Sequence, residues 1–550
     1  MEIAHLTTLT ACSEITHEFL TYRVVCDEYG CQAPGRLGAL KTQWGRISML
    51  KTTPTPETEA ELRERVDRLC AERFMPIVHG WEDHGRTCRP LIEAIAEEGL
   101  FGLTLPTEYG GAGRVDRYSA ILCLLRERFG YHDALIDTQF AIQGLGTNAI
   151  LRMGTDDQRD RYLPGLVEGK TLFSFALTEP HSGSDVLGMR TRAHRDGDEW
   201  VLNGSKMFIS GAPDSDVYIT FARTDDGDKR SVTAFLMETG MPGFTARGGI
   251  ALQAPHAIGY LDFDECRIPD SQRLGEVGQG LRACLGTLEI FRPSVGSATL
   301  GMARRALDLA IGFSTGREAF GGHLSDLEGI RLKLGTMAAM IEGGAALVDR
   351  AANLRDSGQS TIVEGAVSKA FATESAVEVI YQAQQIHGGR GVIVGEEIEM
   401  ISRAVRPTTI YEGASEVQRS IIGRAEAKRI KAGGARPAIT LDTAPADLRA
   451  LLEVLRSTYE SWIGAAGEAI DKPAFHVRLA ETAMAVEAAE TCPDGHARYI
   501  LALSAARALS GNIARTGGTT DCGPVTRAVQ AIERGEDAFA LAIAEQLIDG

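Results

Sequence analysis

The chain has 550 residues, a formal net charge of −17 and a sequence pI near 5.3. Nucleic acid and anionic lipid surfaces attract basic proteins, so this balance argues against partners held by charge and favours small-molecule chemistry. The ten cysteines are scattered without paired Cys/His spacing, which excludes a zinc framework or a disulfide scaffold and fits a reducing cytoplasm. At this length we expect three or four packed units.

Residues 1–56 show little apolar periodicity and match no motif, so we leave them unassigned as an N-terminal extension. Met49 within them is an alternative start of translation. Their acidic residues do not follow the basic-then-apolar order of a signal peptide. Because the chain also lacks a run of eighteen apolar residues, we expect a soluble, cytoplasmic protein without a membrane-spanning segment.

A helical domain is predicted over residues 57–170. Apolar residues recur there at the spacing of one helix face, first at Leu62, Val66 and Leu69. Proline and glycines at residues 105–111 interrupt this pattern and predict a loop between two early helices.

The spacing of apolar residues changes from helical to strand-like in the middle of the chain. β-Branched and aromatic residues between glycine and aspartate turns predict a β-domain over residues 171–278. Ala-rich helical patterns then predict a four-helix bundle over 279–431. Residues 432–446 contain glycines and prolines, as is typical of a linker, and helical spacing predicts a further helical domain over 447–550.

Two segments carry recognisable chemistry, and the first is the run Ala-Leu-Thr-Glu-Pro-His-Ser-Gly-Ser-Asp-Val-Leu-Gly at residues 176–188. Such a loop can approach a planar ring closely, because Thr178 offers a hydroxyl and Gly183 leaves the backbone accessible. The alternative is an ordinary loop that enters the β-domain.

The second segment begins with Gln-Ile-His-Gly-Gly-Arg-Gly at residues 385–391. Its glycines would let backbone N–H groups meet a phosphate without interference from a Cβ atom. It ends at Tyr411, Glu412 and Gly413, where a lone carboxylate between an aromatic residue and a glycine indicates a catalytic base.

At this spacing the two segments resemble the signatures of the acyl-CoA dehydrogenase family, and the resemblance covers about residues 57–430. It implies a mainly α fold with an N-terminal helical domain, a middle β-barrel-like domain and a C-terminal four-helix bundle, here followed by an extra helical domain. It also implies FAD at the domain junction, near the subunit interface of a homodimer or homotetramer. Electron-transferring flavoprotein is the expected electron acceptor.

Two partial matches to the family lie between the signatures. At residues 203–212, Phe208 and Ser210 stand where the family usually has tryptophan and threonine, and a strand with Phe208 in the core is the alternative. Further along, Arg317 precedes Phe320 as in the family's pattern, which implies an arginine that reaches the cofactor pyrophosphate across a subunit boundary, although a surface arginine would also fit. The expected FAD contacts are Leu177, Thr178, Gly183, Ser184, Phe208, Ser210, Arg317, Phe320, Gln385, Gly388, Gly389 and Glu416.

The resemblance implies FAD-dependent α,β-dehydrogenation of an acyl thioester to the 2-enoyl thioester. Glu412 would remove the α-proton while a hydride leaves the adjacent carbon for flavin N5, and a dry pocket would raise its pKa and its basicity. The carrier is coenzyme A or an acyl carrier protein, and chain length is not encoded in the motifs. The expected substrate contacts are Ser184, Arg292, Tyr411 and Gly413.

Three alternatives remain open. Some branched-chain members hold the base on another helix, where Glu289 is the nearest carboxylate here but lies two positions out of register. A flavin-dependent monooxygenase of the same fold would not need Glu412. A flavoprotein of the DNA-damage-response type also carries a helical extension, but the acidic balance disfavours it. His387 receives no catalytic role, because a lone histidine in such a segment is more often a packing residue.

Overall fold

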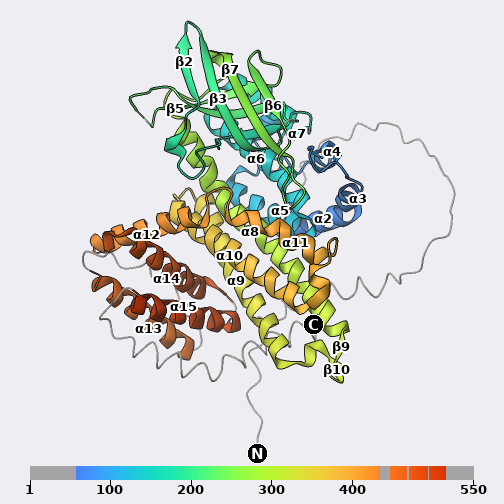
Figure 1. The fold of residues 1–550 in the computed structure, drawn as a ribbon, viewed down its shortest axis with the longest axis vertical. Helices are drawn as coiled ribbons and strands as arrows, with labels where there is room; N and C mark the ends of the chain where they lie inside the picture. Colours follow the sequence, from blue (N-terminus) through green and yellow to red (C-terminus); the bar gives the residue numbers. More distant parts are fainter. Residues whose placement is uncertain are drawn as a thin grey trace, which may run out of the picture.

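The computed structural model describes residues 57–212, 214–228, 230–433, 446–466, 470–493 and 495–515. The N-terminal extension, most of the expected linker and the last part of the expected C-terminal domain lie outside these residues. Figure 1 shows a β-domain at one end, helices beneath it, and a further group of helices beside α12 (Ser415–Lys431). Among the described helices, none combines the length and apolar composition that crossing a bilayer requires.

The chain is helical from its first described element to the start of the sheet. The first helix begins with a capping box, in which the Thr58 hydroxyl accepts from the Glu61 N–H and the Glu61 carboxylate accepts from the Thr58 N–H. The core of this part includes Phe129 and Phe140, whose ring centroids lie 5.1 Å apart. The main helices are α2 (Glu59–Leu69), α3 (Met75–His79), α4 (Arg89–Glu97), α5 (Tyr118–His132), α6 (Ala134–Met153) and α7 (Asp156–Val167).

An eight-stranded sheet forms the middle of the chain, with the order β6-β7-β3-β2-β4-β5-β8 and β1 paired in parallel with β4. Inward-facing Trp200, Tyr218 and Phe235 fill its core. The ladder between β3 and β7 shifts register between Met207 and Ile209. The strands are β1 (Phe173–Ala176), β2 (Arg192–Asp196), β3 (Glu199–Ser210), β4 (Val217–Arg223), β5 (Val232–Glu238), β6 (Phe244–Arg247), β7 (Ile258–Pro269) and β8 (Arg273–Leu274).

Long, Ala-rich helices follow and pack closely. Where α8 crosses α5, a Cβ atom at Gly301 would overlap the Glu127 carbonyl oxygen, so this glycine allows the two backbones to approach. The helices after the sheet, besides α12, are α8 (Gly280–Gly316), α9 (Glu328–Asp356), α10 (Ile362–Ile386) and α11 (Glu397–Val405). A short hairpin of β9 (Glu318–Ala319) and β10 (Gly322–His323) separates α8 from α9.

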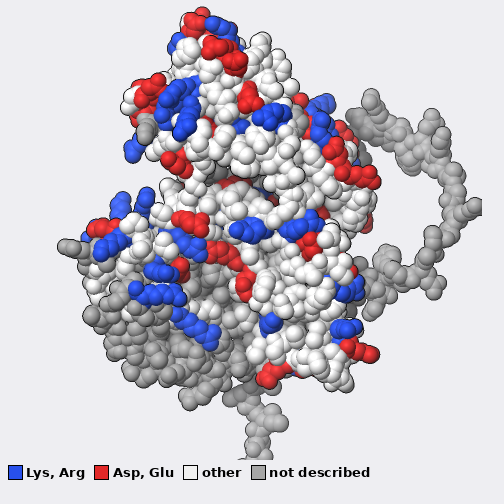
Figure 2. Space-filling model, viewed as in Figure 1, with Lys and Arg blue, Asp and Glu red and all other residues white. Residues whose placement is uncertain are grey.

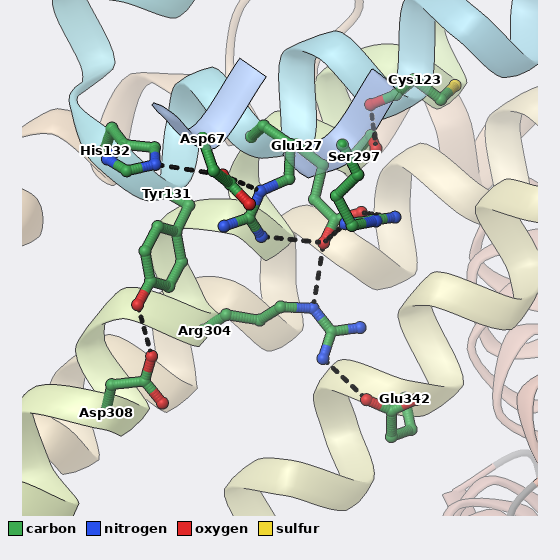
Figure 3. Close-up of polar contacts among 11 residues, drawn as sticks. Asp67, Cys123, Glu127, Tyr131, His132, Ser297, Arg304, Asp308 and Glu342 are labelled. Carbon is green, nitrogen blue, oxygen red and sulfur yellow. Dashed lines mark hydrogen bonds and ion pairs between the residues drawn. The ribbon is translucent and has the colours of Figure 1, made fainter. Parts of the chain in front are cut away.

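A network of ion pairs ties the first helices to this bundle (Figure 3). Glu127 of α5 pairs with Arg304 of α8 at 3.2 Å and with Arg63 of α2 at 3.3 Å. Arg304 also reaches Glu342 of α9 at 2.8 Å. Burial disfavours the charged form of Glu127, but Arg63 and Arg304 outweigh it and lower the pKa of this carboxyl. Arg63, Glu127, Arg304 and Glu342 are linked by these ion pairs, and the network joins α2, α5, α8 and α9.

Three further helices pack on the bundle: α13 (Ala446–Gly464), α14 (Pro473–Thr491) and α15 (Gly495–Arg515). Their buried residues, including Tyr459 and Trp462, belong to the same apolar cluster as those of α9 and α10. The Tyr459 hydroxyl donates to Glu426 of α12 at 3.0 Å. This C-terminal extension therefore continues the core of the bundle.

Candidate active site

The loop that carries Glu412 is held from both sides by hydrogen bonds. Glu412 and Gly413 have φ angles of +53° and +100°, and a left-handed conformation is strained for glutamate. Lys369 Nζ of α10 and Gln418 Nε2 of α12 each donate to the Gly413 carbonyl oxygen at 2.8 Å. These contacts, both from buried side chains, fix the backbone beside Glu412.

The Glu412 side chain is half-buried among charged side chains. Its Oε2 atom is buried without a hydrogen-bond partner. Burial raises the pKa of Glu412 to about 7, although the nearby cations Arg126, Lys369 and Arg292 pull it the other way. A carboxylate in this state has a proton affinity suited to accepting a proton near neutral pH.

Arg126 and Asp137 form a buried ion pair on the α5 and α6 side of this carboxylate. Arg126 Nε and Nη2 donate to the two Asp137 oxygens at 2.8 and 3.0 Å, and Nη1 donates to Ser294 Oγ of α8 at 2.9 Å. The two charged side chains are 1% and 0% exposed. The ion pair therefore places a cation and an anion close to Glu412, and the net charge of the pair is zero.

Arg292 of α8 is also buried, and its Nε atom has no partner. Burial lowers the pKa of its guanidinium, whereas Cys284 and Glu412 act to raise it. Tyr411, the residue before the base, is half-buried, and burial raises the pKa of its hydroxyl. The structure thus gathers Arg292, Tyr411, Glu412 and Gly413, while Ser184 lies on the exposed loop of the first signature.

Glu289, the alternative base, is engaged elsewhere. Its Oε1 atom accepts the Thr361 N–H at 2.7 Å, just before α10, and pairs with Arg355 at 3.1 Å. A carboxylate held by a cation and a backbone donor would have to give up these contacts to approach a substrate. This arrangement argues against Glu289 as the base.

The first signature is built around a second buried glutamate. Glu179 accepts from Lys206 Nζ of β3 at 2.8 Å and from the Arg190 and Thr191 N–H groups at 2.6 and 3.0 Å. Lys206 also donates to the Leu177 carbonyl at 3.2 Å. Burial opposes ionisation of Glu179, but the Lys206 charge and these donors lower its pKa overall. The pair fixes the loop that presents Thr178, Gly183 and Ser184.

At the partial family match in residues 203–212, β3 does not place Phe208 in the core. This residue has a φ of +58° at the register shift and is 49% exposed, so the alternative with Phe208 in the core is wrong. Ser210 Oγ lies 2.7 Å from His256 Nε2, and the His256 Nδ1 atom is buried without a partner. Burial lowers the pKa of His256 to about 4, so the imidazole is neutral and one ring nitrogen faces Ser210.

The remaining expected cofactor contacts lie on the surface. Gln385, Gly388, Gly389 and Glu416 are exposed, and Gly388 has a φ of +57°. Arg317 is exposed beside the hairpin, where Phe320 is 89% exposed with a φ of +55°. At this exposure the Phe320 ring is almost uncovered by the described residues of its own chain.

His387 has the packing role expected of it. Its Nδ1 atom lies 2.8 Å from the Ala383 carbonyl oxygen, and its ring stacks on Phe313 with centroids 4.6 Å apart.

Sequence reasoning missed Lys369, Gln418, Arg126, Asp137 and Lys206. A signal existed for Lys369, because a lysine in an Ala-rich helix predicted to be buried needs a polar partner.

Figure 2 shows the surface hollowed between the β-domain and the helices below it, with acidic side chains visible at its depth.

Comparisons with known proteins identify this architecture. Three domain models match in order: the N-terminal, middle and C-terminal domains of acyl-CoA dehydrogenase, at residues 56–170, 174–266 and 278–427. The chain belongs to the acyl-CoA dehydrogenase family. An acyl-CoA dehydrogenase of Bacillus subtilis is 35% identical over 67% of this chain and 97% of its own length. The caffeyl-CoA reductase-Etf complex subunit CarC of Acetobacterium woodii is 33% identical over 62% of this chain and 90% of its own length.

Among solved structures, an acyl-CoA dehydrogenase from Bacillus anthracis complexed with FAD superimposes with a TM-score of 0.77. It is 23% identical and covers 89% of this chain and 94% of its own. This likeness shows that the fold extends beyond the catalytic core. Members of the family are FAD-dependent oxidoreductases, so the expected fold class and cofactor are confirmed.

The residues present fit FAD. The half-exposed ring of Phe208 and the Ser210 hydroxyl offer apolar and polar contacts at the end of β3, and the exposed backbone at Gly388 and Gly389 is open to a phosphate.

Proposed function

We propose that this chain catalyses the α,β-dehydrogenation of an acyl thioester, with Glu412 as the base that removes the α-proton. One observation carries the proposal: the Glu412 Oε2 atom is buried without a hydrogen-bond partner and the carboxyl has a pKa raised to about 7, on a loop that Lys369 and Gln418 hold in place. The family membership supports the same reaction class.

In this proposal the chain's own residues bind, orient and deprotonate the substrate. The Glu412 backbone N–H would donate to the thioester carbonyl oxygen and stabilise the developing enolate-like charge, while Oε2 accepts the proton from the α-carbon. Arg292 and Tyr411 would line the acyl site beside the base, and Ser184 would contact the thioester from the first signature. FAD, when bound, would accept the hydride from the adjacent carbon.

The cofactor would be held by both signatures and by a second subunit. Leu177, Thr178, Gly183, Ser184, Phe208 and Ser210 would meet the ring, and Gln385, Gly388, Gly389 and Glu416 would meet the pyrophosphate and adenosine. Exposed Arg317 and Phe320 would extend to the FAD of a neighbouring subunit, which makes a homodimer or homotetramer part of the proposal.

Electron-transferring flavoprotein is the proposed acceptor of the electrons. The name of the Acetobacterium woodii relative places it in a complex with such a protein. That relative is named a reductase, so the direction of the reaction needs its own test. The carrier, coenzyme A or acyl carrier protein, is tested in the same experiment.

Anaerobic bleaching of the flavin tests the proposal. The wild type, Glu412→Gln and Glu289→Gln are purified with FAD, and the flavin absorbance is followed while saturated acyl-CoA thioesters of different chain length are added. We expect rapid reduction in the wild type and in Glu289→Gln, and a rate about 10² to 10⁴-fold lower in Glu412→Gln. Equal rates in the wild type and Glu412→Gln would contradict the assignment of the base.

The same assay separates the other functions. Bleaching only by acyl carrier protein thioesters would identify that carrier, and reoxidation of reduced enzyme by an enoyl thioester would show the reductive direction. A hydroxylated product formed with a separate reductase and oxygen, without bleaching by any thioester, would identify a monooxygenase.

A further inference from the structure

A cavity lies between the catalytic core and the C-terminal extension. It has a volume of about 520 Å³ and is lined by α9, α10 and α12 on one side and by α14 and α15 on the other. This is within the range of about 300–1,000 Å³ that is typical of small-molecule sites. None of the residues assigned to the flavin or the thioester lines it.

The walls of this cavity are basic in an otherwise acidic chain. Four arginines line it, Arg419, Arg478, Arg507 and Arg515, against two carboxylates, Glu374 and Glu481. Arg419 pairs with Glu374 at 2.7 Å and Arg478 with Glu481 at 3.0 Å, so the wall keeps a net excess of two guanidinium charges. The chain as a whole has a formal charge of −17, so a local excess of arginine runs against the average. Figure 2 shows basic side chains gathered over α12 and α14, on the side of the molecule where the extension packs. Guanidinium groups bind phosphate oxygens through paired N–H donors.

Two buried polar atoms in the wall have no partner. Arg419 Nη2 donates to Glu374 Oε2 at 2.7 Å, but Arg419 Nε and Glu374 Oε1 are buried without hydrogen bonds. An unsatisfied buried donor and acceptor are costly, and native structures supply water or a ligand to such groups. A cavity of this size has room for much more than the few waters that these two atoms require.

Part of the wall is apolar. Met340, Phe371, Met484 and Ala485 face the same space from α9, α10 and α14. Methionine and aromatic side chains pack well against a planar ring. The cavity therefore offers sites for an anionic group, for a hydrogen-bond donor and for a flat or apolar body.

We propose that this cavity binds a nucleotide-class organic phosphate, with its phosphate on the arginines, a hydroxyl or amino group on Glu374 and its base against Phe371 and the methionines. A fatty carboxylate would suit the arginines and the apolar wall, but it would leave Glu374 Oε1 without a donor. Both a free nucleotide and the nucleotide part of a coenzyme A thioester carry this chemistry. Because both sides of the cavity come from different parts of the chain, the ligand joins the extension to α12, the helix that begins directly after the Glu412 loop.

Calorimetric titration of the full-length FAD-loaded protein tests the proposal, with ADP, coenzyme A, inorganic phosphate and octanoate as separate probes. The variants are Arg478→Gln, Glu374→Gln and, as a matched control that keeps the charge but loses the planar fork, Arg478→Lys. We expect ADP to bind the wild type at one equivalent per chain. Its affinity should fall about ten-fold or more in Arg478→Gln and Glu374→Gln and by less in Arg478→Lys. The thermal midpoint of the wild type should rise with ADP, and that of Arg478→Gln should not.

The probes also distinguish the two sources. One outcome is that ADP gives no heat of binding, while coenzyme A binds the wild type and loses one equivalent of binding per chain in Arg478→Gln. In that case the ligand is a coenzyme A species. The proposal is overturned if no probe depends on Arg478, if inorganic phosphate binds as tightly as ADP, or if octanoate binds more tightly. Flavin reduction by a thioester is measured in parallel, and it should be unchanged in Arg478→Gln, so failure of this proposal is separate from failure of the proposed dehydrogenation.

Discussion

Two glutamates in signature loops of this chain have opposite environments. Glu179 is surrounded by donors: the Lys206 ammonium and two backbone N–H groups bind its oxygens, and its pKa is lowered. Glu412 is half-buried, but its Oε2 atom is buried without a hydrogen-bond partner and its pKa is raised to about 7. Burial acts on both carboxyls in the same direction. At Glu179 the Lys206 charge and the direct hydrogen bonds outweigh burial, whereas at Glu412 the nearby cations, without a hydrogen bond to Oε2, do not.

The comparison separates a structural carboxylate from one suited to chemistry. A carboxylate whose oxygens already accept several hydrogen bonds stabilises its loop and has no free lone pair for a substrate proton. A buried carboxylate oxygen without a hydrogen-bond partner lowers the stability of the fold, and it is retained at a site where a proton must be accepted. We therefore expect changes at Glu179 to appear in stability and changes at Glu412 to appear in rate.

The largest expected effect is the loss of rate in Glu412→Gln. Flavin reduction should slow by about 10² to 10⁴-fold, since the amide cannot accept the proton. The thermal midpoint should not fall, because a neutral amide relieves the cost of burying a charge. Stopped-flow reduction and thermal unfolding of the same sample measure both. A Glu412→Gln variant that lost stability and kept its reduction rate would show that Glu412 has the structural role assigned here to Glu179.

Glu179→Gln should show the opposite pattern. It leaves Lys206 buried opposite an amide, and breaking a buried ion pair typically costs about 3–5 kcal/mol. We expect a lower thermal midpoint and weaker retention of FAD, with the reduction rate per bound flavin close to that of the wild type. Glu199→Gln is the control, because its pair with Arg267 is half exposed and should contribute less than about 1 kcal/mol. Equal stability of the two variants would contradict a structural role for Glu179.

Lys369→Met should have a smaller effect that appears in the pH profile. Lys369 lies near Glu412 and favours its charged form, so removing this cation should raise the pKa of Glu412 and move the midpoint of the rate profile upward by about one pH unit. Gln418→Met removes the other donor to the Gly413 carbonyl without changing any charge. It should slow the reaction without moving the midpoint. If both variants move the midpoint equally, Lys369 acts only through the loop.

The parts of this site that could be predicted from sequence are those encoded locally. The loop from Tyr411 to Gly413 and the run around Thr178 are contiguous, so their residue types indicated their chemistry before any fold was known. Arg126 and Lys369 lie on other helices, and only packing brings them to Glu412. The helical and β segments followed from apolar periodicity, but the left-handed φ of Phe208 depends on a register shift between two strands and has no local signal. The domain limits expected from the pattern remain proposals.

The pH dependence of flavin reduction tests the central claim most directly. Stopped-flow rates with one saturating acyl-CoA are measured in the wild type from pH 5 to pH 9, with bound FAD verified at each pH. Glu412 is protonated below its pKa and cannot accept the α-proton, so the rate should rise with pH, reach half its maximum near pH 7 and level off above it. A profile that is flat down to pH 5 would mean that the carboxyl titrates near its ordinary value of 4.5, and that burial does not prepare Glu412 as the base.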